Sequence, residues 1–345
     1  MMVPDVPVLL LGYGPVGMAY AELLARVSKA AVSKAAVPDV TGQRGGGLRL
    51  AAVVGRSAQC VVGEDGVRPR AEWEPRTPLA DLLDQTGARV VVQATPSHPD
   101  LAAPAVEDAL TAWRHGAHLV TATKCHVLAD WRRLRQVSTQ ARLGFGLSAT
   151  TGAALPAADV ARSALLGYDV QAVRACLNGT STYVVDRMSE GMTLAEAVGE
   201  ARRRGIAEAD PSADLSGADA AGKVRILAGL LWDWDVSTLD VDLAPVDEGT
   251  AAEAVAARRS GARLRPVATA SLDQPGTVRV RLARVEQGDP LHAINGPEKA
   301  VSYDCGEVGV VTVSGGASSP LGAATAMLKD TLRYVTADPL RLGAP

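Results

Sequence analysis

The chain has 345 residues, which is enough for two domains and a sizeable core, and its 47% apolar and 21% charged residues are the proportions of an ordinary globular protein. A formal net charge of -3 gives no electrostatic reason to expect a nucleic acid partner, and no apolar run is long enough to cross a membrane. The first residues lack the basic region of a signal peptide and the four cysteines are scattered without CxxC spacing, so we expect reduced thiols and a cytoplasmic protein.

The first 150 residues alternate predicted strands and helices. The apolar run at residues 8–11 is followed by a glycine turn and a helical pattern that continues to Val27. The duplicated sequence SKAAV at residues 28–37 extends this helix or forms a surface insertion. A helix is expected at residues 101–115, and further strands are predicted at residues 48–54, 89–94, 117–122 and 142–147. Short β-branched runs that alternate with helices indicate a Rossmann-type, doubly wound α/β fold with a parallel sheet covered on both faces.

The pattern changes near residue 150, where we place a domain boundary. Helical stretches dominate residues 156–234, and Thr193 and Glu196 are spaced as in a capping box. Strands are then predicted at residues 263–270, 277–284 and 308–314, and a last helix at residues 323–335. This different layering predicts a second domain of the α+β class.

A glycine-rich turn follows the first strand. Gly12-Tyr-Gly14-Pro15-Val16-Gly17 fits the pattern GxGxxG between a strand and a helix. Gly12 permits the tight turn, Gly14 lets the backbone approach a pyrophosphate, and Gly17 lets the helix pack close to the sheet. The helix N-terminus supplies an anion site. We therefore predict dinucleotide binding, with a plain tight turn as the alternative.

Two later strands end in polar residues. Thr95 follows the strand at residues 89–94, and its hydroxyl is expected either to meet the cofactor or to cap a helix. Lys124 follows the next strand and is either a solvated charge or a cation aimed into the cleft. Open α/β sheets hold ligands at the carboxyl edge of their strands, which favours the cleft for Lys124.

The end of the second strand bears on the choice of cofactor. Residues 48–54 lead into Gly55-Arg56-Ser57, and no acidic residue appears until Glu64. An acidic residue at this strand end takes the ribose 2′-hydroxyl of NAD, whereas an arginine suits the 2′-phosphate of NADP. Arg56 can pair with a phosphate through charge-assisted hydrogen bonds. The sequence therefore favours NADP over NAD, with a solvated loop arginine as the alternative.

Acidic residues gather between residues 205 and 223, where Glu208, Asp210, Asp214 and Asp219 precede Lys223. Carboxylates this close repel one another unless a cation or a polar ligand shares the space. A solvated acidic loop, a metal site and a pocket for a small polar substrate are the three possibilities. A calcium loop would need a different arrangement of oxygen ligands and a central glycine, so that kind of metal site is not expected.

The last part of this stretch has both an ordinary and a functional interpretation. Ser216 and Asp219 are spaced as in a capping box for a helix that continues to about Trp232. Asp219 and Lys223 can form an i,i+4 ion pair worth a few tenths of a kcal/mol. In the functional interpretation, the same spacing places both side chains on one helix face that points into the cleft between the domains.

These motifs together resemble the homoserine dehydrogenase family, in its short form without a C-terminal regulatory domain. The resemblance covers nearly the whole chain in order. It includes the glycine loop, residues 94–97, residues 121–124 (Thr-Ala-Asn-Lys in the family), residues 178–183 (Asn-Gly-Thr-Thr-Asn-Tyr in the family) and the glycine-rich residues 315–318 with the helix that carries Asp330. The most specific match is the acidic stretch, where the matching residues are Gly205, Glu208, Asp210, Pro211, Asp214, Gly217, Asp219 and Lys223.

The resemblance implies the reversible reduction of L-aspartate 4-semialdehyde to L-homoserine with NADPH or NADH. It implies that Glu208 and Asp219 bind the substrate ammonium, with Asp214 supporting them. Lys223 would be the general acid for the aldehyde oxygen, and Lys124 would help to hold or protonate the substrate. These roles suit the chemistry, because hydride delivery to an aldehyde needs a proton on the developing alkoxide.

The resemblance also assigns the parts of the chain. Residues 1–150 would bind the dinucleotide, residues 151–314 would bind substrate and form a homodimer, and residues 315–345 would return to the dinucleotide-binding domain. Gly205 and Gly316, together with Lys124, are implied as further cofactor contacts. No nucleic acid or membrane partner is expected.

Several positions depart from the family pattern. Ser148 stands where the family has a glutamate that helps to bind a monovalent cation, so the ion loses its only formal negative ligand. Backbone carbonyls of Thr151, Ala153 and Leu155 remain as candidate ligands. Two asparagines and one glycine of the family are also replaced, by Thr123, Thr182 and Ser318. We therefore predict no metal site formed by side chains.

Two alternatives remain open from the sequence. One is a related dehydrogenase that acts on another small amino-acid aldehyde or alcohol, and the departures leave it open. The other is a non-catalytic nucleotide-binding sensor on the same fold. The presence of both Lys124 and Lys223 argues against the sensor, because a sensor needs no proton donor.

Overall fold

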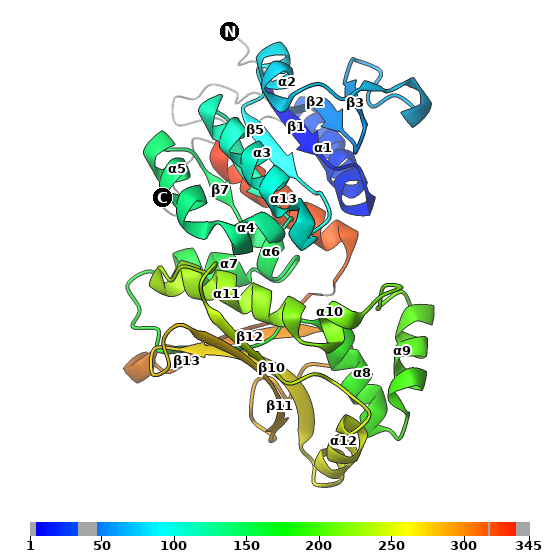
Figure 1. The fold of residues 1–345 in the computed structure, drawn as a ribbon, viewed down its shortest axis with the longest axis vertical. Coiled ribbons are helices and arrows are strands. Elements are labelled where there is room, and N and C mark those ends of the chain that lie inside the picture. Colours follow the sequence, from blue (N-terminus) through cyan, green and yellow to red (C-terminus); the bar gives the residue numbers. More distant parts are fainter. Residues whose placement is uncertain (1–4, 34–46, 317, 336–345) are drawn as a thin grey trace. The chain divides into compact units, whose positions relative to one another are not determined.

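In the computed structural model of the protein, residues 5–33, 47–316 and 318–335 are described (Figure 1). The chain divides into two compact units. The first unit contains Met1–Ala153 and Ser319–Pro345, and the second contains Ala154–Ser318. Each unit has its own sheet and its own hydrophobic core. Among the described residues, every helix is too short or too polar to cross a membrane.

The first unit is built on a seven-stranded sheet in the order β4-β3-β2-β1-β5-β6-β7. The neighbouring strands β2, β1, β5, β6 and β7 are parallel to one another. At one edge of the sheet, β3 pairs with β2 and β4 pairs with β3, both in antiparallel fashion. Their bounds are Val6–Leu11 (β1), Leu48–Val54 (β2), Ala58–Val61 (β3), Glu74–Pro75 (β4), Val90–Gln93 (β5), His118–Thr121 (β6) and Phe145–Gly146 (β7). The predicted Rossmann-type, doubly wound α/β fold is confirmed, although the sheet is parallel only along β2-β1-β5-β6-β7 and not throughout.

Helices cover both faces of this sheet, which explains why its central strand β1 is a continuous apolar run. Val8 and Leu10 of β1 pack with α1 and α13, while Leu9 and Leu11 pack with α2 and α3. In Figure 1, α13 is the red helix of this unit, and it lies against α1. The helices are Pro15–Ser33 (α1), Leu79–Thr86 (α2), Ala102–Arg114 (α3), Cys125–Ala129 (α4), Trp131–Ala141 (α5), Ser148–Thr151 (α6) and Pro320–Val335 (α13).

Some predictions for the first unit need correction. The strand predicted at residues 142–147 is reduced to β7, because Arg142 ends α5 in the left-handed conformation with a φ of 54°. The strands β3 and β4 were not predicted. The first copy of SKAAV, at residues 28–32, continues α1, as one of the two alternatives predicted. The second copy begins at Ser33, the last residue of α1, and its other residues lie outside the described part of the chain.

The second unit has a six-stranded sheet in the order β13-β12-β8-β10-β11-β9. All neighbours are antiparallel except β11 and β9. The strand bounds are Ala172–Cys176 (β8), Asp240–Leu243 (β9), Arg263–Ser271 (β10), Thr277–Val285 (β11), Lys299–Asp304 (β12) and Val310–Gly315 (β13). Figure 1 shows α11 running along one face of this sheet, where Val224 and Leu227 join the core formed with β8, β10 and β11.

The helices of the second unit position the candidate substrate residues. Their bounds are Ala157–Asp159 (α7), Gly179–Ser189 (α8), Leu194–Arg203 (α9), Ser212–Leu215 (α10), Ala218–Trp232 (α11) and Thr250–Arg259 (α12). The predicted capping box at the start of α9 is confirmed, because Thr193 and Glu196 exchange both hydrogen bonds. The predicted helical region at residues 156–234 is wrong at β8, a central strand that pairs with both β10 and β12. The elements β9, β12 and α12 were not predicted.

Candidate functional site

The glycine loop of the first unit has the backbone geometry that its sequence predicts. Gly12 has a φ of 97°, and a Cβ there would clash with the carbonyl of Ala94. A Cβ on Gly17 would clash with the carbonyl of Gly12, so helix and turn pack closely. At Gly14, by contrast, no atom lies within 4 Å of the Cβ position, so the backbone is open to a ligand. Pro15 is the first residue of α1, where its missing N–H costs nothing.

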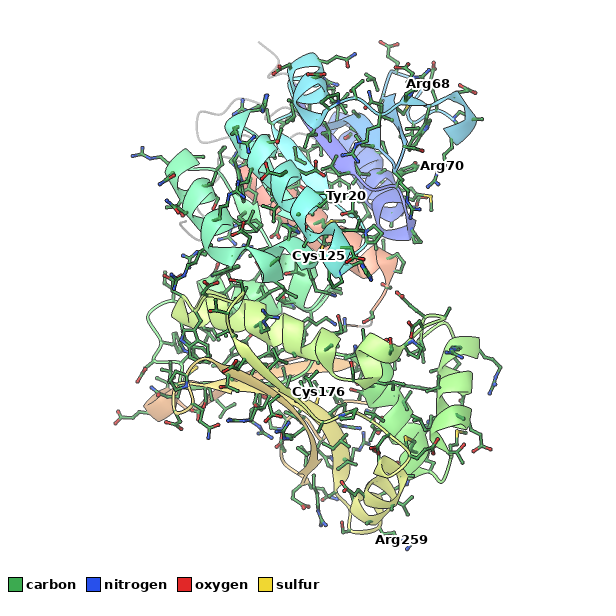
Figure 2. All side chains as sticks on the ribbon, viewed as in Figure 1. Tyr20, Arg68, Arg70, Cys125, Cys176 and Arg259 are labelled. Carbon is green, nitrogen blue, oxygen red and sulfur yellow. The ribbon has the colours of Figure 1, made fainter. Side chains whose placement is uncertain are left out.

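An aromatic and cationic cluster borders this loop. The rings of Tyr13 and Trp73 have centroids 5.4 Å apart, and the Arg70 guanidinium lies 5.7 Å from the first ring and 5.9 Å from the second. Arg70 also donates a hydrogen bond to the carbonyl of Tyr13. Arg68 and Arg70 both lie in the segment between β3 and β4 (Figure 2). Sequence reasoning missed this cluster, because Tyr13 and Arg70 are 57 residues apart and Arg70 belongs to no motif.

Arg56 lies in the tight connection between β2 and β3. The turn is closed by a hydrogen bond of 2.7 Å from Gly55 N–H to the carbonyl of Ala58, and the ring of Trp73 lies 3.2 Å from the Cβ position of Gly55. The Arg56 side chain is exposed and forms no hydrogen bond or ion pair with the rest of the described chain. It is therefore available to an anionic ligand near the Tyr13 and Trp73 rings.

The carboxyl ends of β5 and β6 are tied together by threonines. Thr123 Oγ1 donates to the Thr95 carbonyl at 2.8 Å and accepts from the Thr95 N–H at 3.1 Å. The Thr95 hydroxyl faces that of Thr123 at 3.0 Å, and the cap of the following 3-10 turn is His98. The alternative of Thr95 as a helix cap is therefore wrong. Lys124 is half-buried at the start of α4, with its N–H 2.6 Å from the hydroxyl of Ser97.

The second unit brings three of the predicted substrate residues together. Lys223 Nζ donates to Asp219 Oδ2 at 2.6 Å and to the carbonyl of Leu177 at 2.8 Å. Both side chains are largely buried, with exposed fractions of 12% for Lys223 and 15% for Asp219. The amide of Asn178 donates to Asp219 at 2.8 Å and to Asp214 at 2.5 Å. The i,i+4 ion pair is thus present, as part of a larger polar cluster.

Local structure positions this cluster. Asn178 is the N-cap of α8, where its Oδ1 accepts from the Ser181 N–H, so its amide group is turned toward the two carboxylates. Burial raises the pKa of the Asp214 carboxyl, and the charge of Asp219 raises it further, while the Asn178 amide opposes the shift. A cationic group of a ligand would favour the ionised form of Asp214.

The structure does not join the remaining predicted residues of the second unit to this cluster by any hydrogen bond or ion pair within the described chain. Glu208 is exposed on the turn after α9 and forms no hydrogen bond or ion pair with other described residues. Gly205 has a φ of 67° and begins that turn, while Asp210 accepts from the Ser212 N–H at the start of α10. Gly316 has a φ of 64°, and its Cβ position lies 3.2 Å from the Leu155 nitrogen.

The predicted capping box at Ser216 and Asp219 is wrong. The N-cap of α11 is Gly217, in the left-handed conformation with a φ of 84°, and it makes no side-chain cap. A side chain at this position would crowd Val280, 2.8 Å from the Cβ position. Asp219 is therefore not held by the helix terminus, and its carboxylate bonds to Lys223 and Asn178 instead.

The departures from the family pattern also have defined places. Thr182 donates to the carbonyl of Asn178 at 2.9 Å, within the first turn of α8. Ser148 is buried and bonded to Asp330 and Lys329. Ser318 is exposed. Within the described residues, no group of three or more His, Cys, Asp or Glu side chains could hold a metal ion.

Comparisons with known proteins agree on one relationship. The sequence model of the homoserine dehydrogenase family matches residues 156–332. The NAD(+)-dependent homoserine dehydrogenase of Pseudomonas canavaninivorans is 30% identical over 253 residues, which are 73% of this chain and 72% of that protein. The homoserine dehydrogenase of Methanocaldococcus jannaschii is 28% identical over 73% of this chain and 74% of its own length.

Solved structures share the fold. A hyperthermophilic archaeal homoserine dehydrogenase in complex with NADPH has a TM-score of 0.76 at 22% identity, over 96% of this chain and 97% of its own. The family model and the curated relatives identify the chain as an NAD(P)-dependent oxidoreductase. Within that class, the chain belongs to the homoserine dehydrogenase family.

Proposed function

We propose that the chain catalyses the reversible reduction of L-aspartate 4-semialdehyde to L-homoserine, with the Lys223 cluster as its substrate site. The observation that supports this most directly is the largely buried ammonium of Lys223, held between Asp219 and the Leu177 carbonyl. Hydride transfer to the aldehyde carbon creates an alkoxide that must take up a proton. Lys223 donates this proton in the reduction and accepts it back in the oxidation.

The carboxylates give the site its preference for an amino acid. Asp214 and Asp219 bring two negative charges to one amide, that of Asn178, and Lys223 is bonded to Asp219. An ammonium group of the substrate would be attracted to these two carboxylates and would oppose the rise in the pKa of Asp214 that burial and Asp219 cause. The family resemblance adds Glu208, which lies on an exposed turn, as a further ligand of the ammonium. Lys124 holds the substrate or assists protonation.

The cofactor is proposed to be NADP rather than NAD. Arg56 lies directly after β2 and is exposed, its guanidinium has no partner among the residues that the structure describes, and the neighbouring Trp73 and Tyr13 rings offer a flat apolar surface. A 2′-phosphate would pair with Arg56, and Arg70 adds a second cation beside the rings. The Pseudomonas relative is named for its dependence on NAD(+), whereas an archaeal relative was solved in complex with NADPH. Membership of the family therefore does not decide between the two cofactors, and the proposal rests on the residues of this chain.

A homodimer through the second unit is part of the proposal. Its support is the family resemblance and the edge strand β13, which exposes Val310 at 61% and leaves backbone groups open to pairing. Light scattering coupled to size exclusion should give the mass of two chains, and Val310→Lys should weaken the dimer. A wild-type protein that is monomeric at micromolar concentration would contradict this part. The four cysteines are buried and free, in keeping with a cytoplasmic location.

A panel assay tests the reaction. L-homoserine and close amino-acid alcohols are offered with NADP⁺ or NAD⁺ at alkaline pH, and the absorbance of the reduced cofactor is followed. Homoserine should have the highest kcat/KM, because its ammonium and hydroxyl match the carboxylates and Lys223. Turnover of another amino-acid alcohol without homoserine oxidation would reject the proposed substrate.

A further inference from the structure

A buried serine of the first unit is bound by a carboxylate and an ammonium at the same time. Ser148, the first residue of α6, is 2% exposed. Its N–H donates to Asp330 Oδ2 at 2.9 Å and its hydroxyl donates to Asp330 Oδ1 at 2.8 Å. The ammonium of Lys329 donates to the same hydroxyl at 2.7 Å and lies 3.1 Å from Asp330 Oδ1.

This arrangement can be compared with what a monovalent cation needs. The glutamate that the family resemblance places here would offer the ion a negative oxygen. Ser148 offers only a neutral oxygen, and an ammonium already occupies one side of it. The fully buried Asp330 carboxylate receives at least three donors, two from Ser148 and one from Lys329. A second cation at the serine oxygen would be repelled by the first, so the residues present do not fit the ion.

We propose that the ammonium of Lys329 takes the place of the monovalent cation, so that the protein is stable and active without sodium or potassium. Lys329 and Asp330 are neighbours in α13, and together they bring one positive and one negative charge to Ser148. The buried negative charge is thereby balanced by a side chain of the protein itself. Lys329 acts on the position of α6, and it has no role in the chemical step.

The first experiment compares the wild-type protein in sodium, potassium and choline chloride at equal ionic strength. We expect the same unfolding temperature and the same kcat/KM in all three salts. A bound ion would stabilise the folded state by mass action and would shift the unfolding temperature by more than about 2 °C at saturation. Such a shift in sodium or potassium alone would overturn the proposal. The thermal measurement does not depend on the substrate, so its failure is distinct from failure of the proposed reaction.

The second experiment moves the charge. The double variant Ser148→Glu, Lys329→Met supplies the negative ligand and removes the competing ammonium. Its unfolding temperature should rise when sodium or potassium chloride is added, but not when choline chloride is added. Lys329→Arg keeps the positive charge and should remain indifferent to the salt. Lys329→Met alone should lose activity in choline chloride and regain part of it in sodium or potassium chloride. Should Lys329→Met behave as wild type in every salt, or lose activity that no cation restores, Lys329 is only a surface partner of Asp330 and the replacement is rejected.

Discussion

Replacement of Lys223 by methionine separates a proton donor from an ion-pair partner. Methionine keeps the length of the side chain and removes the charge, so it deletes the bonds of 2.6 Å to Asp219 and 2.8 Å to the Leu177 carbonyl. Breaking a largely buried ion pair costs about 3 kcal/mol of folding free energy, because the remaining carboxylate loses its cation. If Lys223 also protonates the alkoxide, kcat should fall roughly a hundred- to ten-thousand-fold, while cofactor affinity changes little.

A second ion pair of the same unit provides the control. Arg162 lies 3.0 Å from Asp159, and these side chains are 15% and 23% exposed, close to the values for Lys223 and Asp219. Arg162→Met should therefore lower stability by a similar amount and leave kcat near that of the wild type. Homoserine oxidation is measured for both variants at a temperature where circular dichroism shows them folded. A folded Lys223→Met protein with a kcat within about threefold of wild type would refute the role of Lys223 as proton donor.

Three further predictions can be checked with the same purified protein. Arg56→Asp should reverse the preference for NADP or abolish its use, and equal kcat/KM values for NADP and NAD that the substitution leaves unchanged would contradict our assignment. Asp214→Asn should raise the KM for homoserine roughly tenfold or more with a smaller effect on kcat, because it removes one charge from the ammonium site. Burial lowers the pKa of His126 to about 3, whereas the unfolded chain protonates near pH 6.5. The folded state therefore loses stability as pH falls from 6.5 toward 3, by about 1.4 kcal/mol per pH unit, and His126→Leu should flatten denaturation midpoints measured across this range.

Local patterns in the sequence predict much of the first unit. The strands β1, β2, β5 and β6 are short, mainly apolar runs because both faces of the sheet are covered, and such runs can be recognised without knowledge of the strands that pair with them. The strand β8 was missed because its sequence Ala-Val-Arg-Ala-Cys is short and alanine-rich within a helical region. What makes it a strand is its pairing with β10 and β12, which follow it by about a hundred residues.

The same distinction applies to the site. Asp219 and Lys223 are four residues apart on one helix, so their ion pair could be predicted, and Asn178 belongs to a segment that the sequence already singles out. The bond between Ser148 and Asp330 joins residues 182 positions apart, and no local pattern indicates it. Sequence reasoning identified the residues that carry charge within motifs, but it could not identify the partners that distant segments bring to them.

The departures from the family pattern differ in kind from the residues that are retained. Thr123 and Thr182 both donate to backbone carbonyls, of Thr95 and Asn178, so each hydroxyl holds the chain in place. A threonine whose donor is taken up by the main chain changes the lining of a site less than a new charge would. The charged residues of the candidate substrate site, with Lys223 and Asp219 bonded to each other, match the family pattern, and the charge that is lost lies elsewhere, at Ser148. Because an amino-acid aldehyde is recognised mainly by charge, these replacements are compatible with the family substrate and do not require a different one.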